Sequence, residues 1–215
     1  MSLQDTLKHQ KAFLDNIKAR KEPITMNIEG VNIKINPGVF SPATDTKLLT
    51  ANVDIQKGQK FLEMSTGSGA VAVIAGLTGA RGIAIDINPS AVTNARENIQ
   101  KNKVDVKVIK SDMYQNVPAK KFDRIYANGP FSEGEIIEVL DRACYGARDF
   151  TKRLFDGMSK HLKPNGKAYI VFPEWAEVTF FEKCIVDNKL RFKIKTKKSS
   201  DDGKRVYRLY EISFS

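Results

Sequence analysis

Residues 60–69 read Lys-Phe-Leu-Glu-Met-Ser-Thr-Gly-Ser-Gly, and this stretch decides the fold. The largely apolar run at 60–64 predicts a strand, and residues 70–77, after the glycines, predict a helix. Glycine at such a turn lets the backbone approach a ligand closely and adopt conformations that other residues resist. The stretch therefore predicts a strand, a ligand-binding turn and a helix in succession.

Strands and helices alternate outward from this unit. We expect further strands at 82–86, 104–109, 122–127 and 167–172, and helices at 89–102, 148–162 and 175–188. Two last strands, at 192–196 and 206–214, flank a turn and must run antiparallel to each other. The pattern predicts an α/β, Rossmann-like sheet of seven strands, mostly parallel with an antiparallel C-terminal hairpin, and helices on both faces.

The first part of the chain carries a different pattern. Apolar residues share one helical face at Leu3, Leu7, Leu14 and Ile17, so residues 1–22 are expected to form an N-terminal amphipathic helix. Residues 24–29 and 31–35 alternate apolar and polar side chains about a Glu-Gly turn, which predicts a β-hairpin. We therefore divide the chain into this helix and one domain, residues 23–215, that begins with the hairpin.

Composition excludes several classes of protein. The 215 residues are 41% hydrophobic and 28% charged, which is ordinary for a globular chain and unlike a disordered, collagen-like or membrane protein. No secretory leader opens the sequence, so we expect a cytoplasmic location and no membrane partner. Two cysteines, Cys144 and Cys184, and two isolated histidines give no ligand set from which a metal site could be built.

The net charge of +10 lies at the two ends of the chain. Residues 1–21 carry +3, residues 189–208 carry +7, and the rest sums to zero. Basic Arg191, Lys193 and Lys195 alternate with apolar residues, which places them on one face of a strand. Two readings stay open: this face tracks the phosphates of RNA, or it is a solvated edge strand whose lysines prevent unwanted pairing.

Carboxylates stand near the ends of three predicted strands, at Glu63, Asp86 and Asp112. Asp86 suits the two hydroxyls of a ribose, and Asp112 an exocyclic adenine amine. Glu63 would repel a pyrophosphate but pairs with the ammonium of an amino acid. The ligand that fits this set is S-adenosylmethionine. Gly67-x-Gly69 also matches a loose dinucleotide motif, so an NAD-dependent oxidoreductase is the alternative from another class.

The strand at 122–127 ends in Asn128-Gly129-Pro130-Phe131. The sequence here resembles class I S-adenosylmethionine-dependent methyltransferases of the small-domain group, whose fourth strand ends in Asn-Pro-Pro-Tyr or Asn-Pro-Pro-Phe. The resemblance implies that Asn128, Gly129, Pro130 and Phe131 bind a planar nitrogen for methylation, in a glutamine amide or a nucleobase amine. The asparagine oxygen and the next backbone carbonyl can accept both hydrogens of an NH2 group, against the flat ring of Phe131.

A second resemblance lies in Val39 to Leu49, which is similar to the segment before the cofactor loop in HemK-type glutamine methyltransferases, especially their archaeal and eukaryotic branch. It implies cofactor contacts at Thr46, Glu63, Ser65, Gly67, Gly69, Asp86, Asp112, Met113 and Asn128. A protein substrate is expected, a translation release factor in the first place, and a small activator protein is a further candidate partner. An RNA base is the alternative acceptor.

Two residues depart from the family pattern. The family has glycine where this chain has Ser65, and proline where it has Gly129. The departures also allow a catalytically weak subunit that only binds the cofactor. Because proline restores the family pattern, Gly129→Pro is expected to hold or raise activity if the backbone there suits proline.

Overall fold

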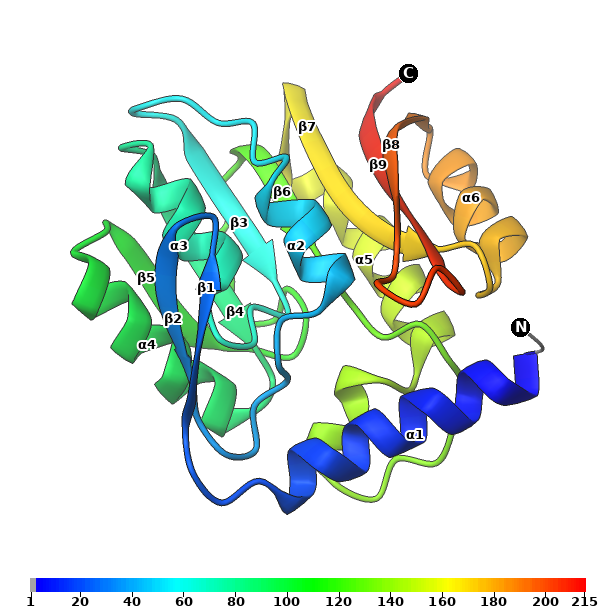
Figure 1. Cartoon of the computed structure of the whole chain (residues 1–215). Helices are drawn as coiled ribbons and strands as arrows, with labels where there is room; N and C mark the ends of the chain where they lie inside the picture. The colour runs from blue at the N-terminus through cyan, green and yellow to red at the C-terminus, as the bar shows by residue number, and fades with distance from the viewer. Residues whose placement is uncertain (1–2) are drawn as a thin grey trace.

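The computed structural model describes residues 3–215, which form a seven-stranded sheet with helices on both faces (Figure 1). The strands are β3 (Lys60–Met64), β4 (Arg81–Asp86), β5 (Val106–Lys110), β6 (Phe122–Ala127), β7 (Leu162–Pro173), β8 (Leu190–Ser199) and β9 (Val206–Phe214). Their order is β5-β4-β3-β6-β7-β9-β8. The first five in this order are parallel, and β9 is antiparallel to both of its neighbours. The predicted sheet is confirmed.

Two apolar clusters cover the two faces of the sheet. On one face the cluster includes residues of α2 (Thr44–Thr50), α3 (Ala70–Leu77) and α4 (Pro89–Asn102). On the other it includes residues of α5 (Ala147–His161) and α6 (Val178–Asp187). Successive strand residues point to opposite faces, so Phe61 joins the first cluster and Leu62 the second. Both faces of the central strands are therefore buried against apolar side chains, as is usual for a parallel sheet.

The strand order reverses beside β3. From β3 the chain moves to β4 and β5 on one side, and then returns to place β6 on the other side of β3. In open α/β sheets the crevice at such a switch point, outside the carboxyl ends of the strands, is where ligands bind. The loops after β3 and β6 meet at this crevice.

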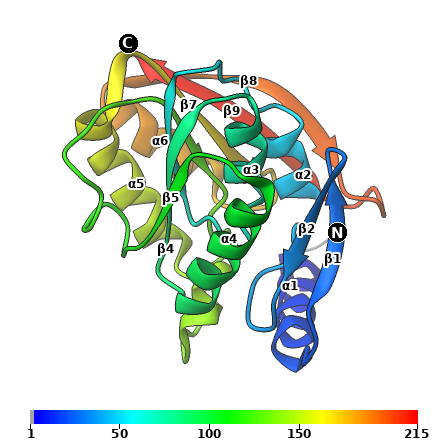
Figure 2. The ribbon, with the colours of Figure 1, turned by 90° about the vertical axis from the view of Figure 1, so that its left-hand side faces the viewer.

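A two-stranded hairpin, β1 (Ile24–Ile28) and β2 (Val31–Ile35), stands apart from the large sheet and packs against α4 (Figure 2). Two fully buried asparagines of α4 hold it. Asn94 and Asn98 both donate to the Lys34 carbonyl oxygen, and the Asn98 side-chain oxygen accepts from the Lys34 amide at 3.0 Å. Asn98 also donates to the Ser68 carbonyl oxygen at 2.9 Å, so one side chain joins the hairpin to the loop after β3.

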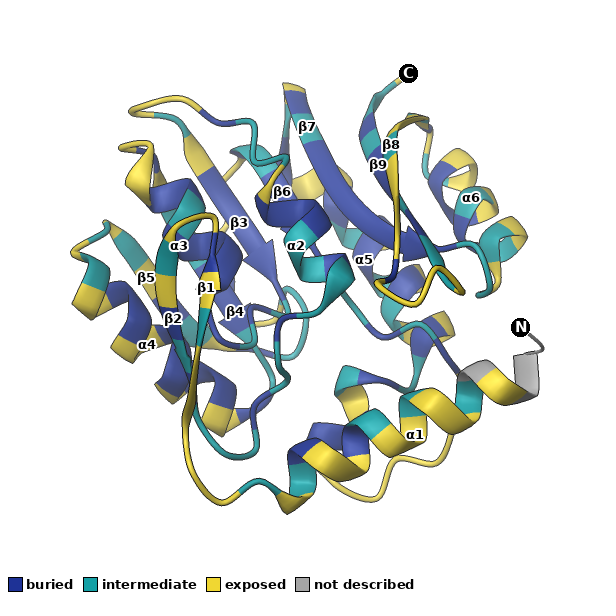
Figure 3. Cartoon of the chain, in the orientation of Figure 1, coloured by how far each residue is buried: buried dark blue, intermediate teal, exposed yellow. Residues whose placement is uncertain are grey.

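The N-terminal helix α1 (Leu3–Ala19) crosses the carboxyl end of the sheet rather than either face (Figure 1). Leu14 and Ile17 pack on a short 3-10 helix, η1 (Val139–Ala143), in a small third cluster. Lys18 pairs with Glu138 at 2.8 Å and with Asp141 at 2.6 Å. Much of the outer surface of α1 is exposed (Figure 3). Helix α1 and η1 together cover the crevice.

Some predicted boundaries were wrong. Helix α6 starts at Val178 instead of residue 175, because residues 174–176 form a turn that leaves Trp175 outside the helix. Strand β7 begins at Leu162 instead of residue 167, and its register against β6 shifts between Phe122 and Arg124. The helix η1 had no sequence signal. Within residues 3–215, no helix is long and apolar enough to cross a membrane.

Candidate active site

The loop after β3 has an unusual backbone. Ser65, Gly67 and Gly69 all have positive φ, at 55°, 54° and 80°. Only glycine adopts this region without strain, so Ser65 carries strain that the two glycines do not. The Thr66 hydroxyl donates to Glu63 Oε2 at 2.6 Å, which fixes that carboxylate under the loop.

Asp86, at the end of β4, is tied to the same loop. Its Oδ2 accepts from the Gly67 amide at 2.8 Å and its Oδ1 accepts from the Asn88 amide at 2.9 Å. The backbone amide of Ile87 also bonds this carboxylate, and burial raises the pKa of Asp86 against these three hydrogen bonds. The two oxygens have four lone pairs between them, so the oriented carboxylate keeps an acceptor position for a further donor such as a ribose hydroxyl.

Glu63 and Asp86 line one central cavity, as the strand ends predicted. Burial, with a smaller contribution from the nearby Asp86, raises the pKa of Glu63 to about 8, against the hydrogen bonds from the Thr66 hydroxyl and the Ala72 amide. A buried carboxyl group with such a pKa gains most from a cation beside it. The two acids and the open space at Gly67 fit the ammonium and ribose of S-adenosylmethionine.

Asp112 and Met113 line a neighbouring side cavity, together with Asp86 and Ser65. Asp112 does not offer a free carboxylate, because Arg153 of α5 pairs with it at 2.9 Å. An adenine amine at Asp112 would share the acceptor with this guanidinium.

Gly69 was expected to contact the cofactor, but it lies elsewhere in the loop. It does not line either cavity but lies behind the loop, where a Cβ would be 3.0 Å from the Ala95 backbone. Its conformation and its close approach to α4 explain the glycine, since any side chain would push the loop away from that helix.

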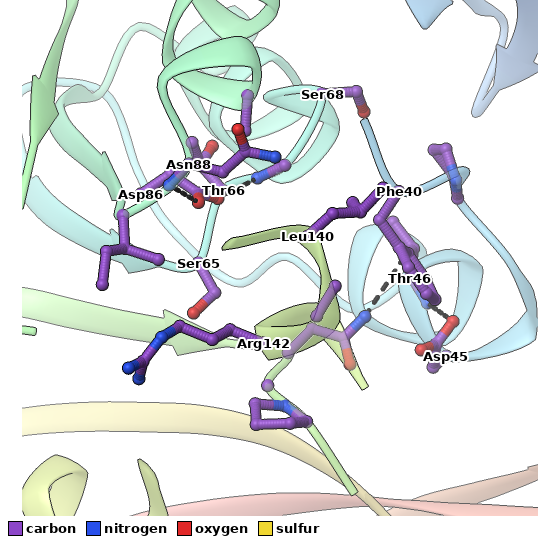
Figure 4. A pocket seen from close by; sticks show the side chains of 18 of the residues that line it. Phe40, Asp45, Thr46, Ser65, Thr66, Ser68, Asp86, Asn88, Leu140 and Arg142 are labelled. Atoms are coloured by element: carbon purple, nitrogen blue, oxygen red, sulfur yellow. Dashed lines mark hydrogen bonds between the residues drawn. The ribbon is translucent and has the colours of Figure 1, made fainter. Parts of the chain in front are cut away.

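The Asn128 amide is held in one orientation. Its Nδ2 donates to Thr46 Oγ1 at 3.2 Å, and its side chain also hydrogen-bonds the buried carboxyl of Asp45. Asp45 accepts from the Thr46 amide at 2.8 Å, and burial raises its pKa. Among the described residues nothing donates to Asn128 Oδ1, which is buried. Asn128 therefore keeps its oxygen for a donor from outside the chain. Thr46, expected to contact the cofactor, lines the central cavity and holds this amide (Figure 4).

The surroundings of Gly129 speak against the expectation that Gly129→Pro holds or raises activity. A Cβ on Gly129 would lie 2.2 Å from the ring of Phe150, which is far inside van der Waals contact. Here Phe150 of α5 fills the space that a side chain at position 129 would take. The glycine and the phenylalanine therefore form a matched pair, and proline does not fit unless Phe150 moves.

Phe131 is fixed by three aromatic neighbours. Its ring packs edge-on against Phe172 and Trp175, with centroids 6.0 and 6.1 Å apart, and is tilted against Tyr207 at 6.2 Å. Phe131 lines the central cavity and also an inner chamber, whose walls include Asp45, Trp175 and Tyr207. Asn128, Gly129 and Pro130 line the central cavity with it. The whole predicted motif thus meets the two buried acids.

Other lining residues had no sequence signal. Gln10 of α1 lines both the central cavity and the inner chamber, and its Oε1 accepts from Ser132 Oγ at 2.5 Å. Leu140 and Arg142 come from η1. These residues reach the site only because α1 and η1 pack on each other, which no local pattern reveals. Asp45 could have been found, since it stands beside Thr46 in the quoted segment.

The basic face near the C-terminus is the edge strand β8. Lys193 pairs with Glu211 at 3.2 Å, Lys197 pairs with Glu174 at 2.7 Å, and the Lys195 ammonium lies 4.9 Å from the centre of the Tyr169 ring. These contacts favour the edge-strand reading, because the charges are partly used within the protein.

Relatives of the chain are methyltransferases. Residues 30–183 match the family described as "Methyltransferase small domain". The chain is 35% identical over 154 residues to "Putative protein N5-glutamine methyltransferase MJ0928" of Methanocaldococcus jannaschii, covering 68% of this chain and 78% of that protein. It is 28% identical over 179 residues to "Ribosomal RNA small subunit methyltransferase C" of Photorhabdus laumondii, covering 78% of this chain and 50% of that protein.

The fold matches solved methyltransferases as well. A 16S rRNA N2 G1207 methyltransferase of T. thermophilus, solved with AdoMet and guanosine, superposes with a TM-score of 0.66 at 17% identity, covering 90% of this chain and 50% of that one. Such a likeness supports the fold, and the family match decides between methyl transfer and hydride transfer with NAD. The chain belongs to the methyltransferase small-domain family, and it is a class I S-adenosylmethionine-dependent methyltransferase.

Proposed function

We propose that this methyltransferase acts on a planar amide or amine nitrogen, and that its acceptor is a glutamine side chain of a protein. The observation that carries the proposal is Asn128. Its amide nitrogen is held by Thr46 and Asp45, and its buried oxygen lacks a donor within the described residues. A buried carbonyl oxygen without a partner is unfavourable, so an N–H from the acceptor would stabilise it.

The residues around Asn128 would position such an acceptor. The side-chain oxygen of Asn128 and the backbone carbonyl of Gly129 can accept the two hydrogens of one NH2 group. The immobilised ring of Phe131 offers a flat surface for the amide plane. An amide nitrogen is a poor nucleophile because its lone pair is delocalised into the carbonyl, so firm placement contributes much of the rate.

The cofactor would be held on the other side of the cavity. Glu63 would pair with the ammonium group, and Asp86 would accept from the ribose hydroxyls. Ser65, Gly67 and Met113 would contact it through the loops that carry them. S-adenosylmethionine supplies an electrophilic methyl group when bound.

Relatives support the protein acceptor first and RNA second. The relative whose name reads "Putative protein N5-glutamine methyltransferase" is the more similar of the two reported relatives and is covered over more of its length. We propose a translation release factor as the protein substrate and a small activator protein as a partner to test. The relatives named as ribosomal RNA methyltransferases make an RNA base amine the second candidate.

The test is methyl transfer from labelled S-adenosylmethionine to purified release factor and, separately, to ribosomal RNA of the same organism. We expect label in the protein, at a glutamine located by peptide mass spectrometry. The Asn128→Ala variant is the matched control and should transfer almost none. Label confined to an RNA base would replace the glutamine proposal by the RNA alternative.

A further inference from the structure

An apolar groove shares the ring of Phe131 with the central cavity. It has a volume of about 240 Å³ and runs between α1, α5 and α6. Its walls include Leu7, Phe131, Ala147, Phe172, Trp175 and Phe180. Helix α1 contributes to this groove through Leu7 and to the central cavity through Gln10. One helix thus forms a common wall from the groove to the site.

The groove is continuous with the acceptor motif. Phe131 lines the central cavity, the inner chamber and the groove, and Trp175 lines the chamber and the groove. A chain lying in the groove would therefore contact Phe131, the same ring against which the acceptor nitrogen would be placed.

Charge in the groove disfavours a phosphate backbone. Its lining holds one cation, Arg148, whose guanidinium is engaged by Glu177 at 2.8 Å and lies 4.9 Å from the centre of the Phe180 ring. Glu133 is a second acid in the lining. Nucleic-acid sites instead place unpaired lysine and arginine along the backbone. The walls of the groove are largely apolar, and its two acidic side chains outnumber its one basic side chain. Such a surface favours a ligand with apolar side chains over a phosphate backbone.

Trp175 adds a polar requirement. Its indole Nε1 is buried, and within the described residues it has no hydrogen-bond partner. The indole nitrogen only donates, so it needs an acceptor such as a carbonyl oxygen. The backbone of an extended peptide supplies carbonyl oxygens along its length together with apolar side chains.

We infer that this groove binds the segment of the protein acceptor that flanks the modified glutamine, as an extended peptide with apolar side chains. The inference rests on the proposed function and adds where the polypeptide lies. The groove would bind the acceptor equally in the ground state and in the transition state, so its loss should raise KM and leave kcat nearly unchanged.

Trp175 provides the binding readout, because it is the single tryptophan in the chain. The protein is titrated with a peptide in which leucine and valine flank a central glutamine, with a peptide in which serine replaces them, and with single-stranded RNA. We expect a saturable change in Trp175 emission with the apolar peptide at concentrations at least about tenfold lower than with either other ligand. An equal or stronger response to RNA would overturn the inference.

Variants test the groove without touching the acceptor motif. Phe180→Glu and Leu7→Glu place a carboxylate in the lining, from two different helices, so a folding defect in one leaves the other informative. Val186→Glu is the matched control, because Val186 lies on α6 with 61% of its surface exposed and outside the groove. We expect KM for the protein acceptor to rise at least about tenfold in both groove variants and to be unchanged in Val186→Glu.

The outcomes separate this inference from the proposed function. If the release factor is methylated with the same KM by wild type and both groove variants, the groove inference fails and the glutamine proposal stands. If only RNA is methylated, the glutamine proposal fails. If, in addition, the peptides do not change the emission of Trp175, the groove inference fails as well.

Discussion

The cofactor half of the site and the acceptor half are built in different ways. The cofactor half consists of loops after three adjacent strands, and Glu63 and Asp86 are each fixed by hydrogen bonds from that loop region. The acceptor half is assembled from α1, α2, the end of β6 and η1, which are remote in sequence. The first half can form as soon as the sheet does, whereas the second depends on packing of the covering segments.

The two halves also differ in what they leave unsatisfied. Asp86 is bonded by the backbone amides of Gly67, Ile87 and Asn88, so most of its acceptor positions are already satisfied within the protein. Asn128 Oδ1 lacks a donor among the described residues. Changes in the cofactor half should therefore appear in cofactor affinity, and changes in the acceptor half in turnover.

The largest effect is expected for Asn128→Ala. The variant removes the oriented acceptor oxygen and should lower kcat at least about a hundredfold, comparable to loss of a positioned hydrogen-bonding group in other enzymes. Affinity for S-adenosylhomocysteine, measured by calorimetry, should change less than about threefold. Thr46→Val keeps the Asn128 oxygen and removes one of the groups that hold the Asn128 amide. Its kcat should therefore lie between the kcat of the wild type and that of Asn128→Ala. Parental turnover in Asn128→Ala would show that the motif is only a turn.

Asp86→Ala probes the cofactor half. It should weaken binding of S-adenosylhomocysteine more than Asn128→Ala does. It removes an acceptor of ribose hydroxyls, and a hydrogen bond to a charged group contributes about 1.5–3 kcal/mol. Affinity for S-adenosylhomocysteine should therefore fall about 10- to 150-fold. Asp112→Ala is the matched control, because Arg153 already pairs with that carboxylate, and its effect should be smaller. Equal effects of the two variants would mean that the ribose is not bound at Asp86.

Much of the cofactor half could be predicted from sequence because its residues follow strands directly. Glu63 and Asp86 stand at the carboxyl ends of neighbouring parallel strands, so their order in the chain gives their place in space. Gly69 was misplaced because a glycine pattern does not distinguish a glycine that faces a ligand from one that faces a helix. The acceptor half was predicted only at its motif. Gln10 and Ser132, 122 positions apart, meet through tertiary packing alone.

Gly129→Pro tests whether the acceptor half is individually fitted. The added ring atoms would overlap Phe150, and overpacking of this kind costs about 1–3 kcal/mol. We expect a lower unfolding midpoint and lower activity than wild type. Phe150→Ala combined with Gly129→Pro should recover more activity than either single variant predicts. Additive effects of the two substitutions would contradict the matched-pair interpretation.

The pH dependence of cofactor binding should come from Glu63. Its pKa is raised to about 8 in the free protein, so it is mostly protonated at pH 7. Pairing with an ammonium favours the ionised form, so binding releases a proton below pH 8. Affinity for S-adenosylhomocysteine should rise from pH 6 to 8, by at most about tenfold per pH unit, and then level off. Glu63→Gln should flatten this slope, and methylthioadenosine, which lacks the amino group, should not show it. If the affinity of the wild type does not change between pH 6 and 8, Glu63 does not bind the ammonium group.

The smallest effect is expected for a reciprocal pair within the loop after β3. Ser65 and Gly67 have nearly the same positive φ, 55° and 54°, and a Cβ on Gly67 would meet nothing within 4 Å. Ser65→Gly relieves backbone strain but also increases the freedom of the unfolded chain, so the free energy of unfolding should rise by no more than about 1 kcal/mol. Gly67→Ser should lower the free energy of unfolding by a similar amount, because it places a side chain at a positive φ. Denaturant unfolding measures both changes. A large loss in Ser65→Gly would mean that the serine side chain makes a contact that stabilises the loop, and that the cofactor half, like the acceptor half, depends on side chains fitted one to another.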